Sequence, residues 1–148
     1  MDYSSLGLAL TKRFEGLRLK AYRDGAGVLT IGYGHTGPDV YEGQIVTELE
    51  AEQLLARDLA SAIACVNAAV KFGVKLTQGQ FDALVDFAFN CGRGNLLSST
   101  LLRMVNAGEL AAAAAQFGLW IHAGGAVEPG LVTRRAAEAA LFSQPLAA

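Results

Sequence analysis

The sequence has few residues that would cross-link it or bind a metal ion. Only two cysteines occur in 148 residues, Cys65 and Cys91, too few for the disulfide framework of a small secreted domain. Neither lies in a CxxC motif or beside histidines at ligand spacing, so we expect no zinc site, no other metal and no cofactor. Both lie in apolar surroundings and are expected to be free, buried thiols, although a bridge between them stays open.

Long apolar runs and a strong charge of one sign are also missing. No segment approaches the roughly 18 consecutive apolar residues of a membrane span, so no stable membrane anchor is expected. The N-terminus lacks the basic and apolar regions of a secretory signal. A net charge of −2 gives no indication of a nucleic-acid partner. The basic residues between Lys12 and Arg23 form either a solvated face or a patch that attracts an anionic polymer.

Apolar periodicity and capping residues predict mainly helices. Ser4 or Ser5 can begin a helix that Gly16 ends. Capping boxes that start at Thr47 and Thr77 predict two more helices, the first of them long. Later helices are expected from 98 or 99 to 108, over 109–120 and over 131–142, with a loop at 122–130.

Residues 17–41 have a different pattern, in which β-favouring side chains alternate with glycines. This pattern predicts a small antiparallel sheet with turns at 24–27 and 36–39. Strands segregated from helices indicate the α+β class. We expect one domain, residues 1–148, with a cleft between two lobes. Its expected parts are a sheet lobe at about 16–46, a linking helix at about 47–68, and a helical lobe at about 69–148 plus the N-terminal helix.

Glu15 is in an unusual place for an acid, because it ends an apolar helix where the helix dipole disfavours a negative charge. Such a site favours the protonated carboxyl. Asp24 lies at a hairpin turn that water can reach, and Thr30 follows one strand later. Two carboxyls in different environments can serve as the acid and the water-activating group of glycoside hydrolysis. Taken alone, an Asp in a turn and a Thr in a strand are more often structural.

The strings EGLRLKAYRD (15–24) and TIGYGHTG (30–37) resemble the active-site region of the phage-type lysozymes of glycoside hydrolase family 24. The family pattern is Glu, eight residues, Asp or Cys, five residues, Thr, which Glu15, Asp24 and Thr30 match. The resemblance continues through LTQGQFDALVDFAFNCG (76–92), residues 99–102, Trp120 and GLVTRRAAE (130–138). It implies a lysozyme-like fold with a small antiparallel sheet lobe and a larger helical lobe joined by a long helix.

The resemblance also implies roles for individual residues. Glu15 would be the general acid, while Asp24 and Thr30 would activate and hold the attacking water in an inverting hydrolysis. Glycan contacts would come from Gly34, Thr36, Phe89, Asn90 and Thr100. Structural or positioning roles would fall to His35, Arg134 and Arg135. Because the two arginines are adjacent on a helix, one is expected to reach toward Glu15 and the other to face water.

The resulting hypothesis is a monomeric endolysin that cuts the β-1,4 bond between N-acetylmuramic acid and N-acetylglucosamine of peptidoglycan. It would be made in the host cytoplasm and reach the periplasmic wall through a holin-type pore. Three alternatives stay open: a glycan-binding module without turnover, a virion-associated lysozyme domain and a lytic transglycosylase. The last would yield anhydro products and would not need Asp24 and Thr30 to position water.

Overall fold

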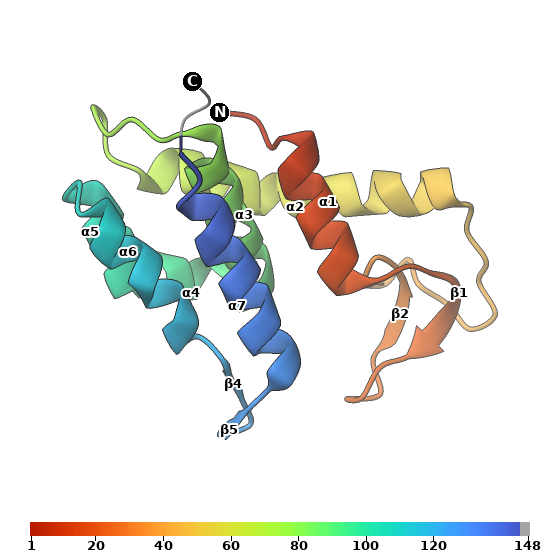
Figure 1. Cartoon of the computed structure of the whole chain (residues 1–148). Helices are drawn as coiled ribbons and strands as arrows, with labels where there is room; N and C mark the ends of the chain where they lie inside the picture. Colours follow the sequence, from red (N-terminus) through yellow and green to blue (C-terminus); the bar gives the residue numbers. More distant parts are fainter. Residues whose placement is uncertain (146–148) are drawn as a thin grey trace. The chain divides into compact units, whose positions relative to one another are not determined.

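The computed structural model describes residues 1–145, which form two compact units. The sheet unit comprises residues 11–61, and the helical unit comprises residues 1–10 together with those from 62 onward. Helices α1 (Ser5–Glu15) and α2 (Glu48–Ala69) each run from one unit into the other. Figure 1 follows the element order along the chain, in which the three strands of the sheet come before a run of helices, and this order confirms the α+β class.

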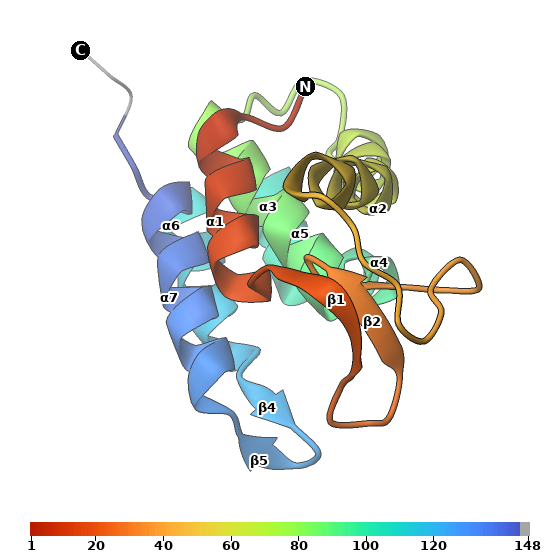
Figure 2. The same ribbon diagram turned by 90° about the vertical axis from the view of Figure 1, so that its right-hand side faces the viewer.

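The sheet unit contains the predicted small antiparallel sheet, which has three strands. Its strands β1 (Arg18–Arg23), β2 (Leu29–Gly32) and β3 (His35–Thr36) lie in that order, and Figure 2 shows β1 and β2 as a long hairpin. The predicted capping box begins α2. Thr47 Oγ1 accepts a hydrogen bond from the Glu50 N–H, and Glu50 Oε1 accepts one from the Thr47 N–H, both at 3.1 Å.

The core of the helical unit is α3 (Gln78–Cys91), in which residues 80–88 are all buried. Thr77 caps its start with the predicted capping box. Helix α7 (Pro129–Phe142) packs along α3, as Figures 1 and 2 both show. Aromatic rings fill the space around α3, where Phe87 meets Phe117 edge-on at 5.8 Å between ring centroids.

The other elements of the helical unit are short. They are α4 (Arg93–Ser98), α5 (Thr100–Asn106), α6 (Leu110–Gln116), the 3-10 turn η1 (Phe117–Leu119), β4 (His122–Ala123) and β5 (Ala126–Val127). Helix α4 was not predicted, because Gly94 and Asn95 have low helix propensity. The expected loop at 122–130 is wrong in part, since β4 and β5 form a hairpin there.

The last helix begins at Pro129, two residues before the predicted start. Proline favours the first turn of a helix because it has no N–H to satisfy there. The preceding Glu128 caps the helix, and its carbonyl accepts hydrogen bonds from the Leu131 and Val132 N–H groups. The cysteines Cys65 and Cys91 are both free and half-buried. Over residues 1–145, no helix combines the length and apolarity needed to span a membrane.

Candidate active site

Glu15 is the last residue of α1 and is half-buried. The chain reverses after it at Gly16, which has a φ of 70°, and the Gly16 N–H bonds to the Lys12 carbonyl at 3.0 Å. The Glu15 carboxyl lies against Gly34 in the turn between β2 and β3. A β-carbon at Gly34 would lie 2.7 Å from Glu15 Oε2. Sheet and helix therefore meet at this carboxyl.

Asp24 is the first residue of the turn between β1 and β2, and it is exposed. Its Oδ1 accepts hydrogen bonds from the N–H groups of Ala26 and Val28, both at 2.9 Å. These bonds fix the orientation of the carboxylate, as is usual for an aspartate that closes a turn. Oδ2 accepts no hydrogen bond from the described part of the chain, so this oxygen remains available to water.

Thr30 is a buried residue of β2. It pairs with Tyr22 of β1 on one side and with Thr36 of β3 on the other. Its Oγ1 donates a hydrogen bond to the Val28 carbonyl at 2.9 Å. Since its one proton is used in this bond, the hydroxyl can interact with a further group only as an acceptor.

An ion pair that the sequence did not reveal lies one helical turn before Glu15. Lys12 Nζ is 2.6 Å from Glu52 Oε1 on α2, and the ammonium lies 5.6 Å from the ring centroid of Tyr33. The hydrogen bond to Glu52 raises the pKa of Lys12 above its ordinary value. Lys12 thus joins the last turn of α1 to Glu52 of α2 and to Tyr33, which directly precedes Gly34.

His35 bridges two carboxylates within the sheet unit. Its Nδ1 lies 2.8 Å from Asp58 Oδ2 of α2, and its Nε2 lies 2.9 Å from the carboxylate of Asp39. Burial lowers the pKa of His35, but the hydrogen bonds and charges of the two aspartates outweigh it and raise the pKa above 6.5. The bond to His35 lowers the pKa of Asp39. These contacts join the first residue of β3 to α2.

The predicted glycan contacts fall in both units. Gly34 and Thr36 lie in the sheet unit beside Glu15 and Thr30, respectively. Phe89, Asn90 and Thr100 lie in the helical unit, and all three are half-buried. Phe89 and Asn90 are at the end of α3, whereas Thr100 begins α5 and accepts a hydrogen bond from Arg103 at 2.7 Å.

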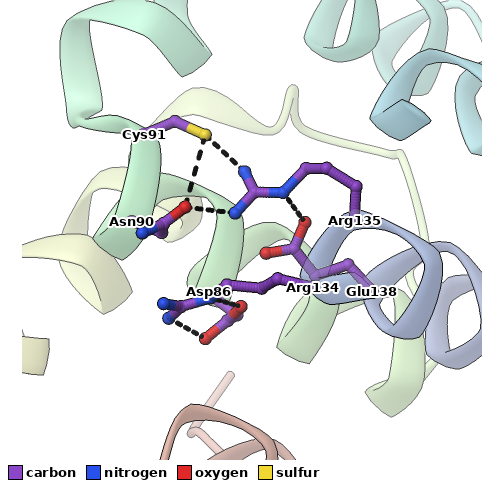
Figure 3. Close-up of polar contacts among 6 residues, drawn as sticks. All are labelled: Asp86, Asn90, Cys91, Arg134, Arg135 and Glu138. Atoms are coloured by element: carbon purple, nitrogen blue, oxygen red, sulfur yellow. Dashed lines mark hydrogen bonds and ion pairs between the residues drawn. The ribbon is translucent and has the colours of Figure 1, made fainter. Parts of the chain in front are cut away.

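Both adjacent arginines of α7 are buried, so the expectation that one of them faces water is wrong. Arg134 forms a two-pronged ion pair with buried Asp86, at 2.9 Å and 2.8 Å. Arg135 donates to the Asn90 Oδ1 and the Cys91 Sγ, as Figure 3 shows. Side chains of α3 are the partners of both arginines: the buried Asp86 pairs with Arg134, and the half-buried Asn90 and Cys91 accept from Arg135. The sequence signal was the aspartate Asp86 within the apolar run FDALVDFAF.

Glu138 completes this buried cluster. Its Oε2 lies 3.1 Å from Arg135 Nε. Burial raises the pKa of Glu138 well above its ordinary value, the neighbouring Asp86 raises it further, and the two arginines oppose the shift. Burial also raises the pKa of the Cys91 thiol. Within residues 1–145, no three His, Cys, Asp or Glu side chains are grouped so that they could hold a metal ion.

Comparison with known proteins adds an independent finding. A sequence model of the family described as phage lysozyme matches residues 12–138. The chain belongs to the phage lysozyme family. An endolysin of Bacillus phage PZA is 49% identical over 145 residues, which cover 97% of this chain and 55% of that protein. An endolysin of Acyrthosiphon pisum secondary endosymbiont phage 1 is 43% identical over 96% of this chain and 98% of its own length.

A solved structure supports the same conclusion about the fold. The muramidase domain of SpmX from Asticaccaulis excentricus is similar with a TM-score of 0.88 and 41% identity, over 97% of this chain and 99% of that one. The fold is therefore lysozyme-like, as the resemblance to the family implied. The chain spans about half the length of the Bacillus phage endolysins that it matches.

Proposed function

We propose that the protein is a peptidoglycan hydrolase that cuts the β-1,4 bond between N-acetylmuramic acid and N-acetylglucosamine. The observation that carries the proposal is the placement of three polar side chains in the sheet unit. Glu15 ends α1 against Gly34, Asp24 closes the β1–β2 turn with one oxygen open, and Thr30 lies in the adjoining strand. Membership of the phage lysozyme family and relatives named endolysin and muramidase support it.

In the proposed mechanism Glu15 is the general acid. Its proton passes to the glycosidic oxygen as the bond from that oxygen to the anomeric carbon breaks. The Glu15 carboxyl can lie against Gly34 because glycine has no β-carbon at this point. The pairing of β2 with β3 fixes the turn that contains Gly34, so the carboxyl is held in one position. The acid is thereby kept ready on one face of the sugar.

The water is held by Asp24 and Thr30. Asp24 Oδ2 and Thr30 Oγ1 can both only accept, so a water between them donates both of its protons to the protein. The lone pairs of that water are then free to form the new bond to the anomeric carbon, and one water proton passes to Asp24. Attack from the face opposite the leaving group inverts the anomeric centre, which requires carboxyls roughly 6.5–9.5 Å apart.

We further propose that Gly34, Thr36, Phe89, Asn90 and Thr100 contact the glycan and that the protein acts as a monomer without a cofactor. We also propose the lytic role, with synthesis in the host cytoplasm and passage to the wall through a holin-type pore. The support for this role is that relatives of the chain carry the name endolysin.

Product analysis tests the chemistry. Purified peptidoglycan is digested in water enriched in oxygen-18, the heavy isotope. The masses of the fragments are measured by mass spectrometry, and their anomers are followed by NMR. We expect muramic acid at the new reducing end, one heavy oxygen for each bond cut, and the α anomer first. Anhydro ends without heavy oxygen would instead favour a lytic transglycosylase, and binding without any cleavage would favour a glycan-binding module.

A further inference from the structure

A pocket of about 430 Å³ opens at the end of α3 in the helical unit. Its size is within the range of small-ligand sites. Its polar wall is formed by Asn90, Asn95, Trp120 and His122, and its apolar wall includes Leu119 and Leu131. All of these residues belong to the helical unit. Neutral amides beside an indole ring suit a neutral polar ligand better than a charged one.

The orientation of one of these amides is fixed from behind the pocket. The fully buried Arg135 donates a hydrogen bond from Nη2 to the Asn90 Oδ1. A guanidinium has five donors and no acceptor, so only the oxygen of the amide can face it. Figure 3 shows the Asn90 nitrogen on the side away from Arg135. The amide therefore presents an N–H donor rather than an acceptor.

Arg135 itself is held on several sides. Its Nη1 contacts the Cys91 Sγ, its Nε lies 3.1 Å from Glu138 Oε2, and its guanidinium lies 5.3 Å from the ring centroid of Phe87. Rotation of this side chain would leave a buried cation without its partners, which is costly. The orientation of the Asn90 amide is thus fixed by the contacts of the buried Arg135.

The second amide of the pocket is oriented by a bond to the backbone. Asn95 Nδ2 donates one of its two N–H groups to the Cys91 carbonyl at 2.6 Å, and its Oδ1 can accept a hydrogen bond from a ligand. Nothing in residues 1–145 bonds to the Nδ2 of Asn90 or to the Oδ1 of Asn95. Trp120 is held edge-on against Phe87 at 5.3 Å between ring centroids. A donor, an acceptor and a fixed aromatic ring together match a secondary amide, which carries one carbonyl and one N–H.

We propose that Arg135 is a positioning residue that orients Asn90, and that this pocket binds a secondary amide of peptidoglycan. Acetamido groups of the glycan and peptide bonds of the stem both contain this group. The inference rests on the proposed function, since that function supplies the polymer. It adds Asn95 and Trp120 to the residues that recognise the polymer, and it gives the buried Arg135 a role in orienting Asn90.

Trp120 makes the test direct, because it is the only tryptophan in the sequence. The full chain is titrated with an N-acetylated chito-oligosaccharide, with the same oligosaccharide after removal of its acetyl groups, and with a free stem peptide. Saturable fluorescence change with the acetylated sugar or with the peptide supports the proposal and identifies the source of the amide. Equal binding of the deacetylated sugar, or no change with any probe, would overturn it.

Asn90→Asp separates recognition from packing. The aspartate still offers an oxygen to Arg135, and adds a charge that strengthens this contact, but it replaces the N–H donor with an acceptor. We expect at least tenfold weaker binding of the probe with no fall in Tm. Asn67→Asp, an exposed amide in another pocket, is the control and should bind like the wild type.

Arg135→Lys is the second variant and should weaken probe binding at temperatures well below its own Tm, because an ammonium cannot replace the fork of donors. If it does not fold, Asn90→Asp alone decides. Unchanged binding by Asn90→Asp would overturn the inference while peptidoglycan cleavage by the wild type still stands. A wild type that cleaves nothing would instead contradict the proposed function.

Discussion

The Glu15 carboxyl and Gly34 are so close that a β-carbon at residue 34 would lie 2.7 Å from Oε2. Gly34 also has a φ of 77°, a conformation that other residues rarely adopt. Two constraints therefore select glycine here, and only one of them concerns the backbone. The distinction can be tested because other glycines carry the same strain without the contact.

Gly34→Ala is expected to lower kcat by about 10- to 100-fold, since displacing a catalytic group by about 1 Å costs this much. Its backbone strain should also lower stability by about 1–2 kcal/mol. Gly43→Ala is the control, because Gly43 has a φ of 80° and open space around its α-carbon. Steady-state kinetics and thermal unfolding of both variants measure the two effects. Equal kcat losses in the two variants would contradict a role for the contact.

The Lys12–Glu52 ion pair should position the end of α1. Glu52→Gln is expected to lower kcat about fivefold and to change stability by less than about 1 kcal/mol, since partly exposed pairs contribute little. The exchange Lys12→Glu with Glu52→Lys should recover most of the lost kcat, because the pair re-forms with its charges reversed. The check is to compare the kcat of Lys12→Glu alone, of Glu52→Lys alone and of the double variant. No recovery in the double variant would argue against positioning by the pair.

The sequence predicted the elements whose signals are local. The capping boxes of α2 and α3 each lie within four residues, and the turn that carries Asp24 is specified by its own glycines. Helix α4 and the β4–β5 hairpin were missed because their short segments contain Gly94, Gly124 and Gly125, which are more typical of loops.

The same contrast holds for the site. Glu15, Asp24 and Thr30 could be proposed from the sequence because one short motif contains all three. The bond from Arg135 to Asn90 joins residues 45 positions apart, and no local pattern indicates it. The burial of both Arg134 and Arg135 likewise depends on Asp86 and Asn90 of another helix, which a helical wheel of α7 alone does not reveal.

The His35 bridge predicts how stability changes with pH. Because the folded state raises the pKa of His35 above 6.5, the protonated imidazole stabilises the fold most below that pH. This contribution should be lost as the pH rises through the folded-state pKa. His35→Asn keeps a donor near Asp58 but cannot be charged, so its stability should lack this decline and be about 1 kcal/mol lower at pH 5.5. Urea unfolding between pH 5.5 and 9 measures both curves, and parallel curves would refute the prediction.

Glu138 predicts a second pH dependence, in the helical unit. The folded state raises its pKa well above 4.5, so the buried carboxyl stabilises the fold most at low pH and less as the pH rises through its folded value. Glu138→Gln removes the titration and should unfold with a flatter pH dependence. Denaturant unfolding from pH 4.5 to 8, with exposed Glu109→Gln as the control, tests this. A wild-type slope in Glu138→Gln would assign the dependence to another group.

The most direct test of the account is the initial rate at which reducing ends are released from purified peptidoglycan by Glu15→Gln. Glutamine keeps the shape of the side chain but has no acidic proton to give, so we predict a rate at least 10²-fold below the wild type, with unchanged thermal unfolding. Glu109→Gln, which changes an exposed glutamate in the same way, should retain the wild-type rate. Wild-type turnover by folded Glu15→Gln would contradict the assignment of Glu15 as the acid.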